Sequence, residues 1–167
     1  MELQSSASPK DESARLQALR ELLILDTAPE ERFDLITKFA KQEFGVPIAL
    51  VSLVDEDRQW FKSSQGLEGT KQTPRSIAFC SHTIQEPECL VVTDTHKDER
   101  FQNNPLVTGQ TGIRFYAGVP LTLPSGHSVG SLCILDVKPR EIDRVDIVIL
   151  TSLKDLVVEE LLRRGAD

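Results

Sequence analysis

The stretch "IRFYAGVPLTLPSGHSVGSLCILD", residues 113–136, decides the fold because it predicts two strands that pair with each other. Both flanks are dominated by apolar residues. The residues between them, Pro124, Ser125 and Gly126, are typical of a turn. Two strands joined by so short a connection run antiparallel. The stretch therefore predicts an antiparallel hairpin.

A second hairpin is predicted upstream of this stretch. The segment "IALVSLVDED", residues 48–57, is nearly continuously apolar and ends in turn residues, which favours a strand buried on both faces. The segment "RQWFKSSQG", residues 58–66, is predicted to pair with it. A further strand is expected over "CLVVTD", residues 89–94. All of these strands fit one antiparallel sheet.

Helices are predicted at both ends of the chain and once in its middle. The first begins after Ser13, the second has Pro29 in its first turn, and the last begins at about Pro139. A short helix capped by Ser76 is expected over residues 76–86. The apolar side of the second helix is formed by Phe33, Ile36, Phe39, Ala40 and Phe44.

This order of elements predicts an α+β domain with an antiparallel sheet of five to six strands. We expect the terminal helices on one face of the sheet. The short middle helix and a long connection over residues 94–113 are expected on the other. Residues 1–11 are interpreted as a flexible leader and residues 12–164 as one domain.

Composition excludes several classes of protein. The 167 residues carry a net charge of −7, and no basic run exceeds Arg163–Arg164, so a nucleic-acid binder is not expected. No apolar run approaches the roughly 20 residues that a membrane helix requires. The N-terminus has no signal-peptide pattern. Three cysteines without close pairing indicate reduced thiols and a cytoplasmic location.

The connection over residues 94–113 is predicted to be an ordered lid rather than a disordered loop. It contains Phe101, Leu106 and Val107, which can be buried. Its Asp and Asn side chains are suited to bonding nearby backbone N–H groups and fixing irregular turns. A long ordered connection of this kind in a compact domain is usually functional.

The sequence resembles the GAF sensory domain, in the form found alone or ahead of bacterial histidine kinases and cyclic-di-GMP enzymes. The resemblance implies a helix–sheet–pocket layout in which a small molecule lies between the sheet and the covering loop. Ligands in the family include cyclic nucleotides, amino acids, tetrapyrroles and haem, so the cofactor here stays unknown. The matching stretches are "ALRELLILDTAPEERFDLITKFA", "PIALVSLVDEDRQWFKSSQGL", "TPRSIAFCSHTI", "VVTDTHKDERFQNNPLV", "IRFYAGVPL" and "GSLCILDVKPR".

Eight residues form the candidate ligand site. Arg114 and Tyr116 share one side of their strand, and we expect that side to face the lid. Arg114 can bind a carboxylate or phosphate, or instead pair with Asp94 or Asp98 and fasten the lid. The eight candidates are Phe79, Cys80, His82, Asp94, Phe101, Asn104, Arg114 and Tyr116.

Neither a metal site nor a specific cofactor is predicted. Cys80 and His82, with Cys89 and His96 further on, are metal-ligand types, but their spacing is not a zinc pattern. Cys80 can also serve in redox chemistry or in tetrapyrrole attachment, although bilin-binding relatives carry their Cys-His pair in a different setting. The segment "HKDERF" only loosely resembles the motif of cyclic-nucleotide-binding relatives.

The resulting expectation is a non-enzymatic, cytoplasmic sensor in a two-component or cyclic-di-GMP pathway. The ligand would order the lid, and the terminal helices would relay the change to a kinase or cyclic-di-GMP enzyme. The last helix has an unusually wide apolar stripe, which favours either a homodimer or packing against the first helix. The alternatives are a structural module without ligand and a free methionine sulfoxide reductase. The catalytic cysteine of that reductase would fall within residues 94–113, which contain none.

Overall fold

The computed structural model describes residues 11–67 and 69–166, and within them it shows one six-stranded antiparallel sheet. The strand order is β3-β2-β1-β6-β5-β4. The strands are β1 Ile48–Val54, β2 Arg58–Gln65, β3 Gln72–Pro74, β4 Leu90–Val92, β5 Phe115–Thr122 and β6 Ser128–Asp136. The helices are α1 Glu12–Glu21, α2 Glu31–Phe44, α3 Cys80–Thr83, α4 Pro105–Thr108 and α5 Arg144–Ala166, with single 3₁₀ turns at Arg75–Ile77 and Thr95–Lys97.

The predicted hairpin over residues 113–136 is confirmed. β5 pairs antiparallel with β6, with Val119 opposite Leu132, and β1 pairs with the other side of β6. Gly126 in the connecting turn has a φ of 93°, a value that favours glycine. The short strand β3, which the strand assignments above lack, extends the sheet to six strands by pairing with β2.

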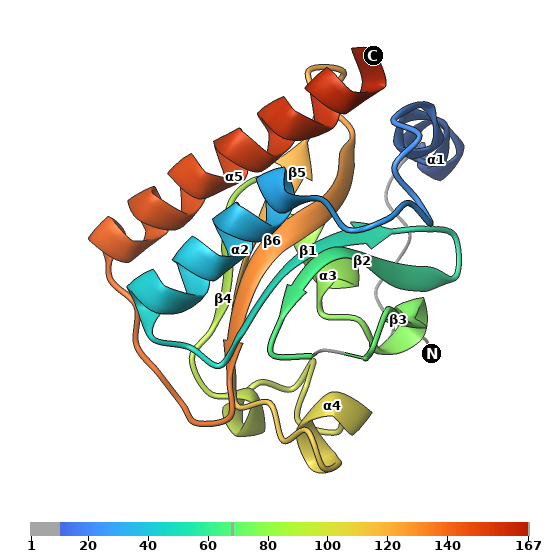
Figure 1. The fold of residues 1–167 in the computed structure, drawn as a ribbon. Helices are drawn as coiled ribbons and strands as arrows, with labels where there is room; N and C mark the ends of the chain where they lie inside the picture. The colour runs from blue at the N-terminus through green and yellow to red at the C-terminus, as the bar shows by residue number, and fades with distance from the viewer. Residues whose placement is uncertain (1–10, 68, 167) are drawn as a thin grey trace.

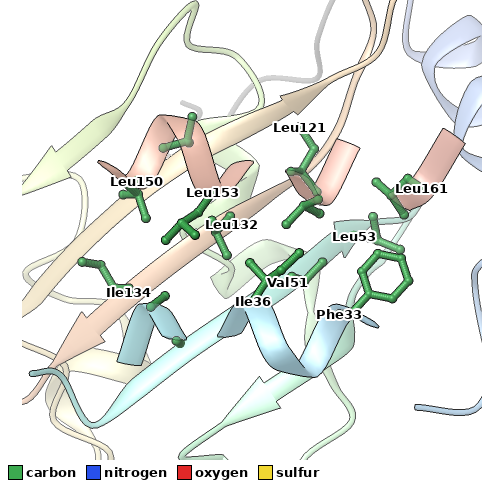
Figure 2. Packing of buried hydrophobic residues seen from close by; sticks show 14 of the residues in the cluster. Phe33, Ile36, Val51, Leu53, Leu121, Leu132, Ile134, Leu150, Leu153 and Leu161 are labelled. Carbon is green, nitrogen blue, oxygen red and sulfur yellow. The ribbon is translucent and has the colours of Figure 1, made fainter. Parts of the chain in front are cut away.

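The two faces of the sheet carry separate apolar clusters, as the continuous apolar run of β1 predicts. Helices α2 and α5 lie side by side over one face, and α3 lies over the other (Figure 1). On the helical face, Phe33 and Leu153 pack against Leu53 and Leu132 of the sheet (Figure 2). Residues Leu50 and Val54 of β1 belong to the cluster on the opposite face. The expected layering of helices and sheet is therefore present.

The start of α2 and the position of Phe39 differ from expectation. Glu30 is extended, and its carboxylate pairs with Arg32 and Lys62 at 3.0 and 2.7 Å, so the helix begins at Glu31 rather than around Pro29. Phe39 is 48% exposed. It follows Phe33 by six residues, which places it well away from the buried side of a helix with 3.6 residues per turn.

The middle segment is not one helix over residues 76–86. A 3₁₀ turn at Arg75–Ile77 is followed by Ala78 in an extended conformation, and α3 covers only Cys80–Thr83. Ser76 therefore caps no helix. The break at Ala78 separates the two turns, and both Phe79 and Cys80 are buried in the cluster on the sheet face opposite α2 and α5.

The last helix begins at Arg144, later than the expected start near Pro139. Asp143 and Asp146 cap it reciprocally: the Asp146 N–H donates to the Asp143 carboxylate at 2.8 Å, and the Asp143 N–H donates back at 3.1 Å. Helix α5 packs along α2, and Arg32 pairs with Glu160 at 2.7 Å. Four of its large apolar side chains are exposed: Val145, Val148, Leu156 and Leu162.

Two further expectations concern the chain ends and the membrane. Residues 1–10 of the expected leader lie outside the described residues. Among the residues that the structure describes, no helix has the length and apolar character needed to cross a membrane.

Candidate functional site

A narrow cavity lies between the sheet and the segment over residues 94–113, which we call the lid. The lid contributes Leu106, Thr111 and Ile113 to its wall. The remaining lining residues come from the sheet, the loops beside it and α3: Leu50, Gln59, Phe61, Leu67, Thr73, Phe79, Cys80, Tyr116, Cys133 and Leu135. The cavity therefore occupies the place where the sequence predicted a ligand site.

The cavity is small. A water-sized sphere can occupy about 40 Å³ of it, enough for a few water molecules. Ordinary small-molecule pockets measure roughly 300–1,000 Å³. Half-buried or exposed residues such as Leu106 and Thr111 mark its outer end, whereas Cys80, Tyr116 and Cys133 are about 1% exposed. A ligand larger than a few atoms therefore requires the lid to move.

A polar cluster closes the inner end of the cavity. The Tyr116 hydroxyl forms a hydrogen bond of 2.7 Å with the hydroxyl of Thr83 on α3. The Cys80 thiol forms one of 2.8 Å with the hydroxyl of Ser131 and a longer one of 3.5 Å with Tyr116. A Cβ atom at Gly118 would lie 2.2 Å from the Tyr116 Oη atom, so Gly118 provides the space for this ring.

The pKa values of the two buried thiols of this cluster are shifted in opposite directions. Burial raises the pKa of Cys80, but the neighbouring Cys133 thiol and the Ser131, Tyr116 and Ser52 hydroxyls outweigh it, so this pKa lies below its ordinary value. Burial, together with hydrogen bonding to Cys80, raises the pKa of Cys133 well above its ordinary value. Burial likewise raises the pKa of Tyr116, which keeps its hydroxyl protonated.

The two ends of the lid are fastened to each other. Asp94 pairs with Arg114 at 3.0 Å, and its other bond caps the turn at Thr95–Lys97 by accepting the His96 N–H. The Thr95 hydroxyl donates to the Ile113 carbonyl at 2.7 Å, and the Thr95 N–H donates to the Arg114 carbonyl at 2.9 Å. These bonds fix the base of the lid against the start of β5.

The middle of the lid is anchored by an aromatic stack and by one asparagine. Phe101 is 1% exposed and stacks on Phe79 with ring centroids 4.3 Å apart, and its ring meets the edge of His82 at 4.9 Å. Asn104 caps α4 by accepting the Leu106 N–H, and its amide donates to the Ile77 carbonyl at 3.0 Å. Asp98 pairs with Arg100 beside this stack at 2.7 Å. The lid is therefore ordered in the way its composition predicts.

The eight candidate residues separate into two groups. Three line the cavity, namely Phe79, Cys80 and Tyr116. The other five hold the lid rather than line the cavity: His82, Asp94, Phe101, Asn104 and Arg114. The expectation that Arg114 faces the cavity gives way to the alternative interpretation, because Arg114 lies just before β5 and its guanidinium is occupied by Asp94. Ser131 and Thr83, which complete the polar cluster, are not among the residues that the sequence singled out.

Metal-ligating side chains do not gather here. Across residues 11–67 and 69–166 there is no group of three or more His, Cys, Asp or Glu side chains that could hold a metal ion.

The comparison with protein families identifies the fold. The family model described as GAF domain matches residues 28–161. The chain belongs to the GAF domain family. A GAF domain from an Acinetobacter phosphoenolpyruvate-protein phosphotransferase has a TM-score of 0.65 and 18% identity, covering 92% of this chain and 96% of that one. A domain of a putative two-component sensor histidine kinase from Sinorhizobium meliloti 1021 has a TM-score of 0.63 and 17% identity, and the match covers 84% of this chain and 96% of that domain.

One curated relative corrects the expectation of a non-enzymatic protein. A Pseudomonas aeruginosa protein named as a cyclic di-GMP phosphodiesterase is 39% identical over 154 residues. The match covers 92% of this GAF chain and 26% of the relative, so the chain spans about a quarter of the relative's length. The expectation is wrong because a chain of this kind matches part of a protein that is named as an enzyme.

Proposed function

We propose that this GAF domain is a cytoplasmic input domain of a signalling protein that senses a small molecule in the cavity beneath the lid. Its similarity to part of a protein named as a cyclic di-GMP phosphodiesterase supports a cyclic-di-GMP enzyme as the output, and a histidine kinase is the second possibility. The observation that carries the proposal is a largely apolar cavity with a separately fastened lid.

The size of the cavity sets how the signal enters. A molecule of a few heavy atoms fits the space as it stands, whereas a larger ligand must displace Leu106 and Ile113 of the lid. Displacement of the lid disturbs the packing of Phe101 on Phe79, the residue just ahead of α3. The ligand can shift the equilibrium only if it binds one lid position better than the other.

A chain of hydrogen bonds connects the lid to the terminal helices. The Arg114 N–H donates to the Asp136 carbonyl at 2.8 Å, and the Asp136 carboxylate accepts from Arg140 at 2.9 Å. Arg140 also donates to the carbonyls of Phe44 and Gly45 at the end of α2 and lies just ahead of α5. We propose that movement at the base of the lid reaches α2 and α5 along this route.

The surface of α2 and α5 supports a homodimer as the structure that reads this movement. Leu35 and Phe39 of α2 are 57% and 48% exposed, and Val148 of α5 is 57% exposed. Exposed apolar side chains gathered on neighbouring helices favour a protein interface. Sedimentation velocity is expected to show a dimer that Phe39→Glu converts to a monomer of unchanged helix content. A monomeric wild-type protein at all concentrations would refute the dimer.

Mass spectrometry of small molecules released from the purified protein tests ligand binding. The identified molecule, added back, is expected to raise the melting temperature, because binding to the native state stabilises it. The variant Leu106→Trp fills the cavity and is expected to lose this shift. Thr108→Trp, exposed on the same short helix, serves as the matched control and keeps it. An equal shift in both variants would place the ligand elsewhere, and a protein without any ligand would favour the structural module.

A further inference from the structure

Two thiols meet at the inner end of the cavity. Cys80 projects from α3 and Cys133 from the central strand β6, and both line the cavity. The Cys80 sulfur lies 2.8 Å from the hydroxyl of Ser131, which precedes Cys133 by two residues and shares its side of β6. Cys89, the third cysteine, is half-buried and is not among the residues that line this cavity. These two cysteines therefore differ from an isolated core cysteine, because both line the same cavity.

We propose that Cys80 and Cys133 form a redox pair, which a small hydroperoxide entering the cavity converts to a disulfide. The inference rests on the proposed function, because it takes the cavity as the site where the signal enters and names the chemical class of that signal. None of the sequence expectations paired these two cysteines.

The surroundings of Cys80 suit the thiol that attacks. Its sulfur lies 2.8 Å from the Ser131 hydroxyl and 3.5 Å from the Tyr116 hydroxyl, two groups able to donate to a thiolate. The buried Ser52 hydroxyl has no hydrogen-bond partner of standard geometry, yet it lies near enough to lower the pKa of Cys80. The thiolate is the reactive form of cysteine. A buried thiol that ionises beside hydroxyl donors is therefore poised to react.

The environment of Cys133 suits the thiol that resolves. Burial and the neighbouring Cys80 raise the pKa of Cys133. Strand β6 holds it in place through pairing with both neighbours, opposite Leu50 of β1 and Gly118 of β5. Cys133 is therefore held in a fixed position near Cys80.

The chemistry balances in two steps. The Cys80 thiolate attacks one oxygen of the hydroperoxide; the O–O bond breaks, an S–O bond forms, and the leaving oxygen takes up a proton as water or an alcohol. Cys80 is then a sulfenic acid. The Cys133 sulfur attacks the Cys80 sulfur; the S–S bond forms, the S–O bond breaks, and the hydroxyl leaves as water with the thiol proton of Cys133. Two electrons pass from the thiol pair to the peroxide.

The volume of the cavity selects the oxidant. About 40 Å³ of space accepts a molecule of the size of hydrogen peroxide, which has two heavy atoms. A bulky disulfide or a nucleotide has no room unless the lid opens. The narrow cavity, which argues against a large ligand, is suited to a small oxidant.

Disulfide formation has a direct route to the lid. The two sulfurs must approach to about 2.05 Å. Because β6 is paired on both sides, the single-turn helix α3 is the element that can move. Phe79, the residue before Cys80, stacks on Phe101, and His82, two residues after Cys80, forms a T-shaped contact with the same ring. Oxidation therefore pulls on the two aromatic contacts that hold the middle of the lid.

Treatment of the native protein with hydrogen peroxide, followed by peptide mapping, tests the pair. The expected product is a Cys80–Cys133 disulfide, with the intact mass lowered by two hydrogens and Cys89 unmodified. Cys133→Ser is expected to stop at a sulfenic acid on Cys80 that a dimedone probe labels. Cys80→Ser is expected to lower the reaction rate at least about tenfold, whereas Cys89→Ser, the matched control, reacts as the wild-type protein does.

Two results would overturn the proposal. One is oxidation of Cys89 at a rate equal to that of Cys80 in the folded wild-type protein, a comparison that requires no variant to fold. The other is a Cys80–Cys133 disulfide that forms only after unfolding in urea. Ligand release and melting-temperature shifts are measured in thiol-reducing buffer, where both cysteines stay reduced. Failure of the redox pair therefore leaves these ligand measurements unchanged, and failure of ligand binding leaves the peroxide experiment unchanged.

Discussion

Phe101→Ala is expected to lower the free energy of unfolding by about 3 kcal/mol, because truncating a buried phenylalanine to alanine costs roughly 3–5 kcal/mol. The ring is 1% exposed and contacts Phe79 and His82 on one side, while the Arg100 guanidinium lies 5.2 Å from its centre. Its loss leaves the middle of the lid without its largest apolar anchor. For a chain of this size the melting temperature is expected to fall by roughly 6–12 °C.

The substitution also separates the role of the lid from that of the fold. Hydrogen exchange in Phe101→Ala is expected to rise across residues 94–113 through local opening, while β1 and β6 remain the most slowly exchanging strands. Phe101→Leu is the matched control, because it keeps an apolar side chain at this position and should retain most of the stability. A Phe101→Ala protein as stable as the wild type would show that the lid is held by its polar bonds alone.

Gly130→Ala is expected to destabilise the sheet by about 3 kcal/mol or more, at the upper end of the cost of overpacking. Gly130 lies opposite Leu53, where β6 meets β1. A Cβ atom there would lie 1.9 Å from the carbonyl oxygen of Ser52 and 2.9 Å from the Leu53 Cα atom. Both are backbone atoms, so no side-chain rotation relieves the overlap, and β1 and β6 must separate.

Circular dichroism during thermal unfolding measures this effect. Gly126→Ala is the matched control: its Cβ atom would meet nothing within 4 Å, but its φ of 93° costs about 1 kcal/mol for a residue with a side chain. Gly130→Ala is therefore expected to melt well below Gly126→Ala. Equal melting temperatures for the two variants would mean that the β1–β6 contact is looser than the structure shows.

Local patterns predicted the architecture because each depends on nearby residues. The hairpin of residues 113–136 follows from its turn and apolar flanks, and the burial of β1 follows from its continuous apolar run. The helix starts were less predictable. Whether Glu30 begins a helix depends on Lys62, and whether Arg140 lies in a helix depends on carbonyls at the end of α2. Such distant partners leave no mark in the local sequence.

The site was only partly predictable for the same reason. The lid's composition predicted an ordered segment, and the alternation of β5 placed Tyr116 on one face. The proximity of Cys133 to Cys80 required the register of β6 against β5 and β1, as well as the break at Ala78 that ends the preceding turn. Arg114 had two partners open to it in the sequence, and the three-dimensional position of Asp94 decided between them.

Hydrogen exchange of the lid in the free protein is the most direct measurement of the central claim, that the lid over residues 94–113 can move away from the sheet to admit a ligand to the cavity. The reporting amides include Phe101, hydrogen-bonded to Asp98, and Ile113, hydrogen-bonded to Leu106. Independent opening predicts that these amides exchange much faster than those of β1, β5 and β6, and that low denaturant leaves their rate unchanged. Exchange of lid and sheet at one common, denaturant-sensitive rate would contradict the account.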